Sequence, residues 1–130
     1  MNLESPKKTV EKSAQYLYDS LSDVKNYEQL MPENIAKFEV TGPDSFIFGL
    51  KGMPEIKLIV KEKVPASKVV LGAASDKMPF TLTININAVA ENTSTVQLVF
   101  DGQFNAMMAM MAKGPISKFI ENLVGNMPKL

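Results

Sequence analysis

The 130-residue chain contains no histidine, cysteine, tryptophan or arginine, and all fourteen of its basic residues are lysines. The missing histidines and cysteines exclude the common structural zinc sites and the catalytic arrangements that pair serine or cysteine with histidine. Without arginine, no guanidinium can hold a phosphate or carboxylate through two parallel hydrogen bonds. A general acid or base must therefore be an aspartate, glutamate, lysine or tyrosine.

Fourteen acidic residues balance the lysines, so the net charge is zero. Because nucleic-acid binding needs a surplus of positive charge, we expect no nucleic-acid partner. The sequence has no run of about eighteen apolar residues, so we expect no membrane span. The first eight residues lack the apolar region of a signal peptide, which favours a cytoplasmic protein. With no repeat or linker, the chain is predicted to form one domain over residues 1–130.

The N-terminal third predicts one strand and two short helices. Residues 2–10 form the strand, and Pro6, which lacks an N–H, places it at a sheet edge. Ser13 is a good N-cap for a helix whose apolar residues follow at helical spacing. A second helix is predicted over residues 24–30. It ends at Met31-Pro32, because the residue before a proline is pushed out of the helical region.

From residue 35 the apolar period changes to two, which predicts six successive strands. Turns or loops divide them at residues 42–44, 52–54, 64–66, 75–79 and 91–93. Short connections imply an antiparallel meander with one apolar face. The apolar segment 104–124 is the element long enough to cover that face. The predicted class is α+β: a curved antiparallel sheet of six to seven strands, two short helices after the first strand, and a long C-terminal helix packed across the sheet.

This element order is similar to the helix-grip fold of the START-like superfamily, also called SRPBCC, which includes the birch-pollen allergen and polyketide cyclases. The segment from Ser13 to Tyr27, SAQYLYDSLSDVKNY, resembles the opening helix of that superfamily. Leu30-Met31-Pro32 resembles the stop seen in small bacterial members. The resemblance covers essentially the whole chain. It rests on packing motifs, so it implies a fold and not an activity.

Four methionines lie within one and a half turns of the predicted last helix: Met107, Met108, Met110 and Met111. Met108 and Met111 share a face with Phe119. Three interpretations remain open: the methionines fill a core, form the pliable wall of a cavity, or make an exposed patch for a protein partner or lipid. The Gly114-Pro115 pair predicts a kink or break, which either follows the curvature of the sheet or serves as a hinge.

The leading hypothesis is that a small hydrophobic or amphipathic molecule, lipid-like or polyketide-like, binds between the sheet and the last helix. Two tyrosines, Tyr18 and Tyr27, are candidate polar contacts. The sequence indicates no metal and no cofactor. The predicted cavity wall is formed by Phe38, Phe46, Phe48, Leu58, Phe80, Leu82, Leu98, Phe100, Met107, Met108, Met111 and Phe119.

Two alternatives belong to other classes. One is an enzyme of the cyclase or hydratase kind, which needs a tyrosine, lysine or carboxylate with a perturbed pKa in the pocket. The other is an interaction module that docks on a protein partner and holds no ligand. We expect a monomer or a weak dimer.

Overall fold

The computed structural model describes residues 1–52, 55–74 and 79–130. Its helices are α1 (Ala14–Ser22), the 3-10 helix η1 (Val24–Leu30), α2 (Ala106–Gly125) and the short 3-10 helix η2 (Met127–Lys129). Its strands are β1 (Asn2–Glu4), β2 (Lys8–Val10), β3 (Ile35–Gly42), β4 (Ser45–Leu50), β5 (Ile56–Val64), β6 (Lys68–Ala73), β7 (Phe80–Ala90) and β8 (Thr93–Gly102). The expected turn at 52–54 and loop at 75–79 fall largely outside the described residues.

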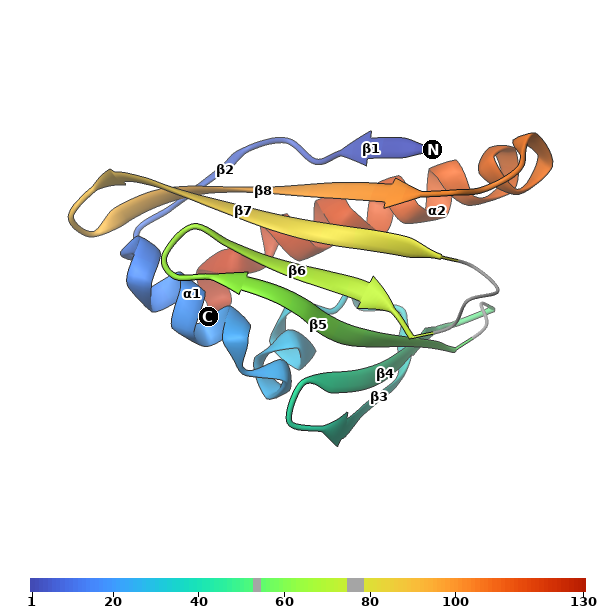
Figure 1. The fold of residues 1–130 in the computed structure, drawn as a ribbon, viewed down its shortest axis with the longest axis horizontal. Helices are drawn as coiled ribbons and strands as arrows, with labels where there is room; N and C mark the ends of the chain where they lie inside the picture. The colour runs from blue at the N-terminus through green and yellow to red at the C-terminus, as the bar shows by residue number, and fades with distance from the viewer. Residues whose placement is uncertain (53–54, 75–78) are drawn as a thin grey trace.

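The strands form one antiparallel sheet in the order β1-β8-β7-β6-β5-β4-β3, with β2 also paired to β8. The sheet curves around α2, which crosses one of its faces (Figure 1). The predicted α+β helix-grip architecture is therefore confirmed. The sheet has one strand more than the upper predicted number, because the first predicted strand is divided into β1 and β2.

The division between β1 and β2 falls at Ser5-Pro6. The buried Ser5 keeps the strand attached through three hydrogen bonds. Its N–H donates to the carbonyl of Leu98 at 2.9 Å, its Oγ accepts the N–H of Leu98 at 2.9 Å, and its carbonyl accepts from Gln97 Nε2 at 3.0 Å. Beside the proline, the hydroxyl of Ser5 thus accepts a hydrogen bond from the N–H of Leu98 on the neighbouring strand, in place of a backbone carbonyl. The predicted edge position of this segment is confirmed.

The two short helices begin and end where the sequence indicates. The hydroxyl of Ser13 accepts the N–H of Tyr16 at 3.1 Å and caps α1. The carboxylate of Asp23 accepts the N–H of Lys25 at 3.1 Å and caps η1. Met31 is extended, as expected before a proline, so the chain leaves η1 there.

The apolar core lies between the sheet, α1, η1 and the C-terminal part of α2. Three residues of α2 are buried, Ile120, Leu123 and Val124, and all belong to its last two turns. The first turns of α2 lie beyond the end of β8 in Figure 1. The core is made of Val10, Ala14, Leu17, Leu21, Val24, Tyr27, Leu30, Met31, Phe46, Phe48, Leu58, Val69, Leu71, Leu82, Ile84, Ile86, Val96, Leu98, Phe100, Ile120, Leu123, Val124 and Met127.

No break occurs at Pro115, because α2 runs as one helix from Ala106 to Gly125. The preceding residue, Gly114, explains this outcome. A proline in a helix crowds the Cβ of the residue before it, and glycine has no Cβ. The Gly-Pro pair therefore permits the helix to continue where another residue before Pro115 would oppose it.

Candidate functional site

A groove of about 640 Å³ lies between the C-terminal half of α2, the segment that leaves η1 and the end of β4. We call it the helix groove. Its lining residues are Met31, Pro32, Glu33, Asn34, Leu50, Lys51, Pro115, Lys118, Phe119, Asn122, Asn126 and Lys129. Its volume falls within the range of about 300–1,000 Å³ typical of small-molecule sites.

Backbone and side-chain hydrogen bonds hold the walls of the helix groove. The N–H of Lys51 donates to the carbonyl of Asn34 at 3.0 Å, which joins the end of β4 to the segment before β3. On the other wall, Nδ2 of Asn126 donates to the carbonyl of Leu30 at 3.0 Å. This bond fixes the end of α2 against η1. The groove is thus formed by segments that are tied to one another and needs no ligand to define it.

A column of aromatic rings fills the interior next to the helix groove. The rings of Phe119 and Phe48 are parallel, with centroids 4.9 Å apart. Phe46 lies 6.2 Å from Phe48, 5.1 Å from Tyr27 and 5.3 Å from Phe38. These rings occupy space between the sheet and the helices that the sequence assigned to a cavity. The room for a ligand therefore lies beside the column, with Phe119 exposed to it.

The charge of the helix groove is predominantly positive. Lys51, Lys118 and Lys129 line it together with one carboxylate, that of Glu33. In the described part of the chain, none of these lysines lies within 4 Å of a carboxylate oxygen, and the ion pairs present there involve other lysines. The groove thus combines an apolar wall with amines that can receive an anionic group.

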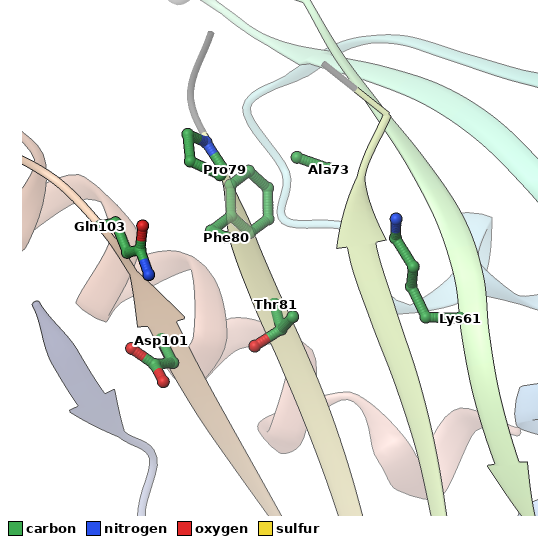
Figure 2. A pocket seen from close by; sticks show the side chains of 7 residues that line it. All are labelled: Lys61, Ala73, Pro79, Phe80, Thr81, Asp101 and Gln103. Carbon is green, nitrogen blue, oxygen red and sulfur yellow. The ribbon is translucent and has the colours of Figure 1, made fainter. Parts of the chain in front are cut away.

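A smaller hollow of about 310 Å³ lies at one end of the sheet. Figure 2 shows Thr81 and Asp101 on the neighbouring strands β7 and β8, and Lys61 on β5, with β6 between β5 and β7. The other residues that line the hollow are Ala73, Pro79, Phe80 and Gln103. Lys61 lies over Gly72, where an added Cβ would come within 2.5 Å of Cε of the lysine. We take the helix groove as the candidate site because it is larger and offers both apolar side chains and several amines.

The structure separates the twelve predicted wall residues into groups. Phe119 lines the helix groove, Phe80 lines the smaller hollow, and Phe38 and Met108 are half-buried. Met107 and Met111 are exposed, so the expected inward placement of these two side chains is corrected. They lie on the turns of α2 that precede its buried part. The remaining six are buried in the core: Phe46, Phe48, Leu58, Leu82, Leu98 and Phe100.

Neither predicted polar contact, Tyr18 or Tyr27, lines either hollow. Tyr27 is buried in the core, and its hydroxyl donates to the carbonyl of Leu21 at 2.8 Å. Burial raises the pKa of Tyr27 far above its ordinary value, because the phenolate would be desolvated. This tyrosine is a neutral structural donor. Tyr18 is half-buried on α1, where it packs against the core.

The polar residues of the helix groove were missed in the sequence. Lys118, Asn122 and Asn126 recur every four residues and so lie along one face of α2. The four-residue spacing of these polar residues, next to the apolar Phe119, is the sequence pattern that indicates them. Lys51 carries no such signal, because its place beside α2 depends on the tertiary fold.

No family model and no curated protein matches the chain. Solved structures do match. A START superfamily protein from Mycobacterium smegmatis aligns with a TM-score of 0.71 at 14% identity, over 98% of this chain and 97% of that one. This chain has a START-like fold.

Two further solved structures share the START-like fold. A conserved protein from Geobacillus kaustophilus aligns with a TM-score of 0.74 at 12% identity, over 99% of this chain and 93% of that one. Norcoclaurine synthase from Thalictrum flavum, in complex with dopamine and hydroxybenzaldehyde, aligns with a TM-score of 0.74 at 11% identity, over 99% and 84% of the two chains. At these identities the likeness concerns the START-like fold itself.

Proposed function

We propose that this chain binds a small amphipathic molecule in the helix groove, with its apolar part against Phe119 and its polar part toward the lysines. The observation that carries the proposal is the groove itself, about 640 Å³ in volume, with Met31, Leu50 and Phe119 among its lining residues. Contact with these side chains removes apolar ligand surface from water, which favours binding by about 25 cal/mol per Å² before the costs of association.

The lysines support an anionic polar group on this ligand. Lys118 and Lys129 lie on the helical side of the groove, and Lys51 lies on the sheet side. An ammonium group is a point charge that attracts a carboxylate or phosphate without requiring a fixed geometry. We therefore expect discrimination between ligands to depend on charge and on the length of the apolar part.

A pair of probes with the same apolar chain tests this proposal. Decanoate carries a negative charge and decanol does not. Each is titrated into ¹⁵N-labelled protein, and the amide shifts of Leu50, Lys51 and Asn122 are followed. We expect both probes to shift these amides and decanoate to bind several-fold more tightly. Unchanged groove amides with both probes would refute the proposal.

Two variants separate the apolar and the ionic contributions. Lys118→Gln combined with Lys129→Gln is expected to weaken decanoate binding several-fold and to leave decanol binding unchanged. Lys63→Gln combined with Lys68→Gln is the control with an equal change in net charge, because these lysines lie on β5 and β6, where they pair with Asp44 and Glu62 away from the groove. An equal loss in both lysine variants would indicate a general effect of net charge.

A further inference from the structure

The N-terminal half of α2 exposes three methionines, Met107, Met110 and Met111, which we call the methionine patch. Their side chains are 73%, 84% and 75% exposed. Met107 and Met111 are four residues apart and share a face of the helix, and Met110 lies beside them. Exposed apolar side chains occur singly on most protein surfaces, whereas three on adjacent helical positions mark a site of contact.

The charged residues of α2 nearest the methionine patch are positive. Within residues 106–120 of α2 the charged residues are Lys113 and Lys118, and the first acidic residue of the helix is Glu121. Lys118 lies seven residues after Met111 and therefore on the same face. Lys113 lies three residues after Met110. Although the chain is neutral as a whole, this face of α2 thus offers apolar side chains flanked by amines.

This charge pattern disfavours a second copy of the chain as the occupant. In a two-fold symmetric contact, each residue meets the equivalent surface of the partner. Residues 106–120 carry no carboxylate, so this part of α2 in a second copy offers no opposite charge to Lys113 and Lys118. A negatively charged surface complements the patch instead.

The position of the patch further favours a lipid surface. The first turns of α2 lie beyond the end of β8, so the methionines stand at an extremity of the molecule (Figure 1). Methionine is unbranched and adapts its shape, which suits a fluid apolar medium as well as it suits a fixed pocket. An apolar helix face with flanking lysines is the pattern of helices that lie in the interface of an anionic membrane.

We propose that the methionine patch docks on the surface of an anionic phospholipid bilayer, with the three methionines in the headgroup region and Lys113 and Lys118 at the phosphates. Pro115, Lys118 and Phe119 of the helix groove follow Met111 by one to two turns of α2. Docking through the patch places the mouth of the groove near the membrane. The inference rests on exposure and charge and stands whether or not the groove holds a ligand.

Vesicle flotation tests the proposal. The whole protein is mixed with vesicles of phosphatidylcholine alone or of phosphatidylcholine and phosphatidylglycerol at a ratio of about 3:1. We expect flotation with the anionic vesicles and much less with the neutral ones. Replacing Met107, Met110 and Met111 together by glutamine, which has similar helix propensity, is expected to lower the partition coefficient at least tenfold. Lys113→Gln is expected to lower it severalfold.

Val89→Gln is the matched control, because Val89 is 61% exposed at the far end of β7 and outside the patch. It is expected to float as the unaltered protein does. Circular dichroism and the urea midpoint establish that each variant is folded. The proposal is overturned if the protein floats with neither vesicle or if the triple variant floats equally well. It is also overturned if sedimentation shows a dimer that the triple variant abolishes.

Discussion

Phe48 of β4 and Phe119 of α2 stack with parallel rings whose centroids lie 4.9 Å apart. This pair joins the sheet to the last helix, and its Phe119 ring also lines the helix groove. Packing and the proposed binding are therefore coupled at one residue, Phe119, which contacts the core on one side and the groove on the other.

Phe119→Ala is expected to lower the free energy of unfolding by about 2 to 3 kcal/mol. The value is below the full range for a buried phenylalanine, because Phe119 is only half-buried. Urea denaturation measures it. Phe46→Ala, which removes a fully buried ring, is the comparison and is expected to cost about 3 to 5 kcal/mol. If both variants lose the same free energy of unfolding, the stack of Phe119 on Phe48 contributes more to stability than the partial exposure of Phe119 implies.

The buried Tyr27 predicts a loss of stability at high pH. Its raised pKa means that the folded protein retains the phenolic proton while the unfolded chain releases it above about pH 10. The stabilising contribution is complete below that pH and declines above it, by up to about 1.4 kcal/mol per pH unit. Urea denaturation between pH 8 and pH 11 measures the slope.

The variant Tyr27→Phe isolates this contribution. It leaves the carbonyl of Leu21 without its partner and is expected to cost about 1 to 3 kcal/mol near pH 7. Above pH 10 the difference from the unaltered protein should shrink. Tyr16→Phe removes a phenol that is 47% exposed and serves as the control. If the free energies of unfolding of Tyr27→Phe and the unaltered protein differ by the same amount at every pH, Tyr27 is not the cause of the loss of stability at high pH.

Ser5→Ala tests the hydrogen bonds that bridge the break between β1 and β2. Without the hydroxyl, the buried N–H of Leu98 loses the acceptor that lies 2.9 Å away. We expect a loss of about 1 to 3 kcal/mol, measured by thermal or urea denaturation. Ser45→Ala removes a hydroxyl from an exposed pair with Thr41 and should change stability by less than about 0.5 kcal/mol.

Two glycines should respond to alanine with opposite signs. Gly125 ends α2, and an added Cβ would meet nothing within 4 Å, so Gly125→Ala is expected to stabilise the protein by about 0.5 to 1 kcal/mol. Gly52 has a φ of 80°, which strains any residue with a Cβ, so Gly52→Ala should destabilise it by about 1 to 2 kcal/mol. If both substitutions shift the denaturation midpoint in the same direction, this account is refuted.

The sequence predicts the elements of this fold better than it predicts the inner face of α2. Alternating apolar residues identify β3 to β8, and Ser13 and Pro32 mark where the short helices begin and end. Residues 106–112, in contrast, are alanine and methionine alone, so their periodicity distinguishes no inward face. Exposure of these methionines depends on where the sheet ends beneath the helix.

The prediction of the candidate site was incomplete for a related reason. Phe119 lines the groove as its apolar character suggests, whereas Phe46 and Phe48 stack with neighbouring rings and fill the core. A strand pattern identifies the apolar face of a sheet, but the position of the remaining empty volume depends on how the rings pack. Lys51 and Lys118 line the same groove only because β4 ends beside α2.

The pairing of β1 and β2 with β8 has a consequence for the order of folding. Ser5 and Leu98 are 93 positions apart, and their hydrogen bonds require both segments. At about 5–20 residues per second, a ribosome makes the intervening chain in roughly 5 to 20 seconds. During that interval the neighbouring strands from β3 to β7 can pair with one another, whereas the first ten residues have no partner strand. Attachment of the N-terminal edge is therefore a late event, and its amides should be among the last to gain protection from hydrogen exchange.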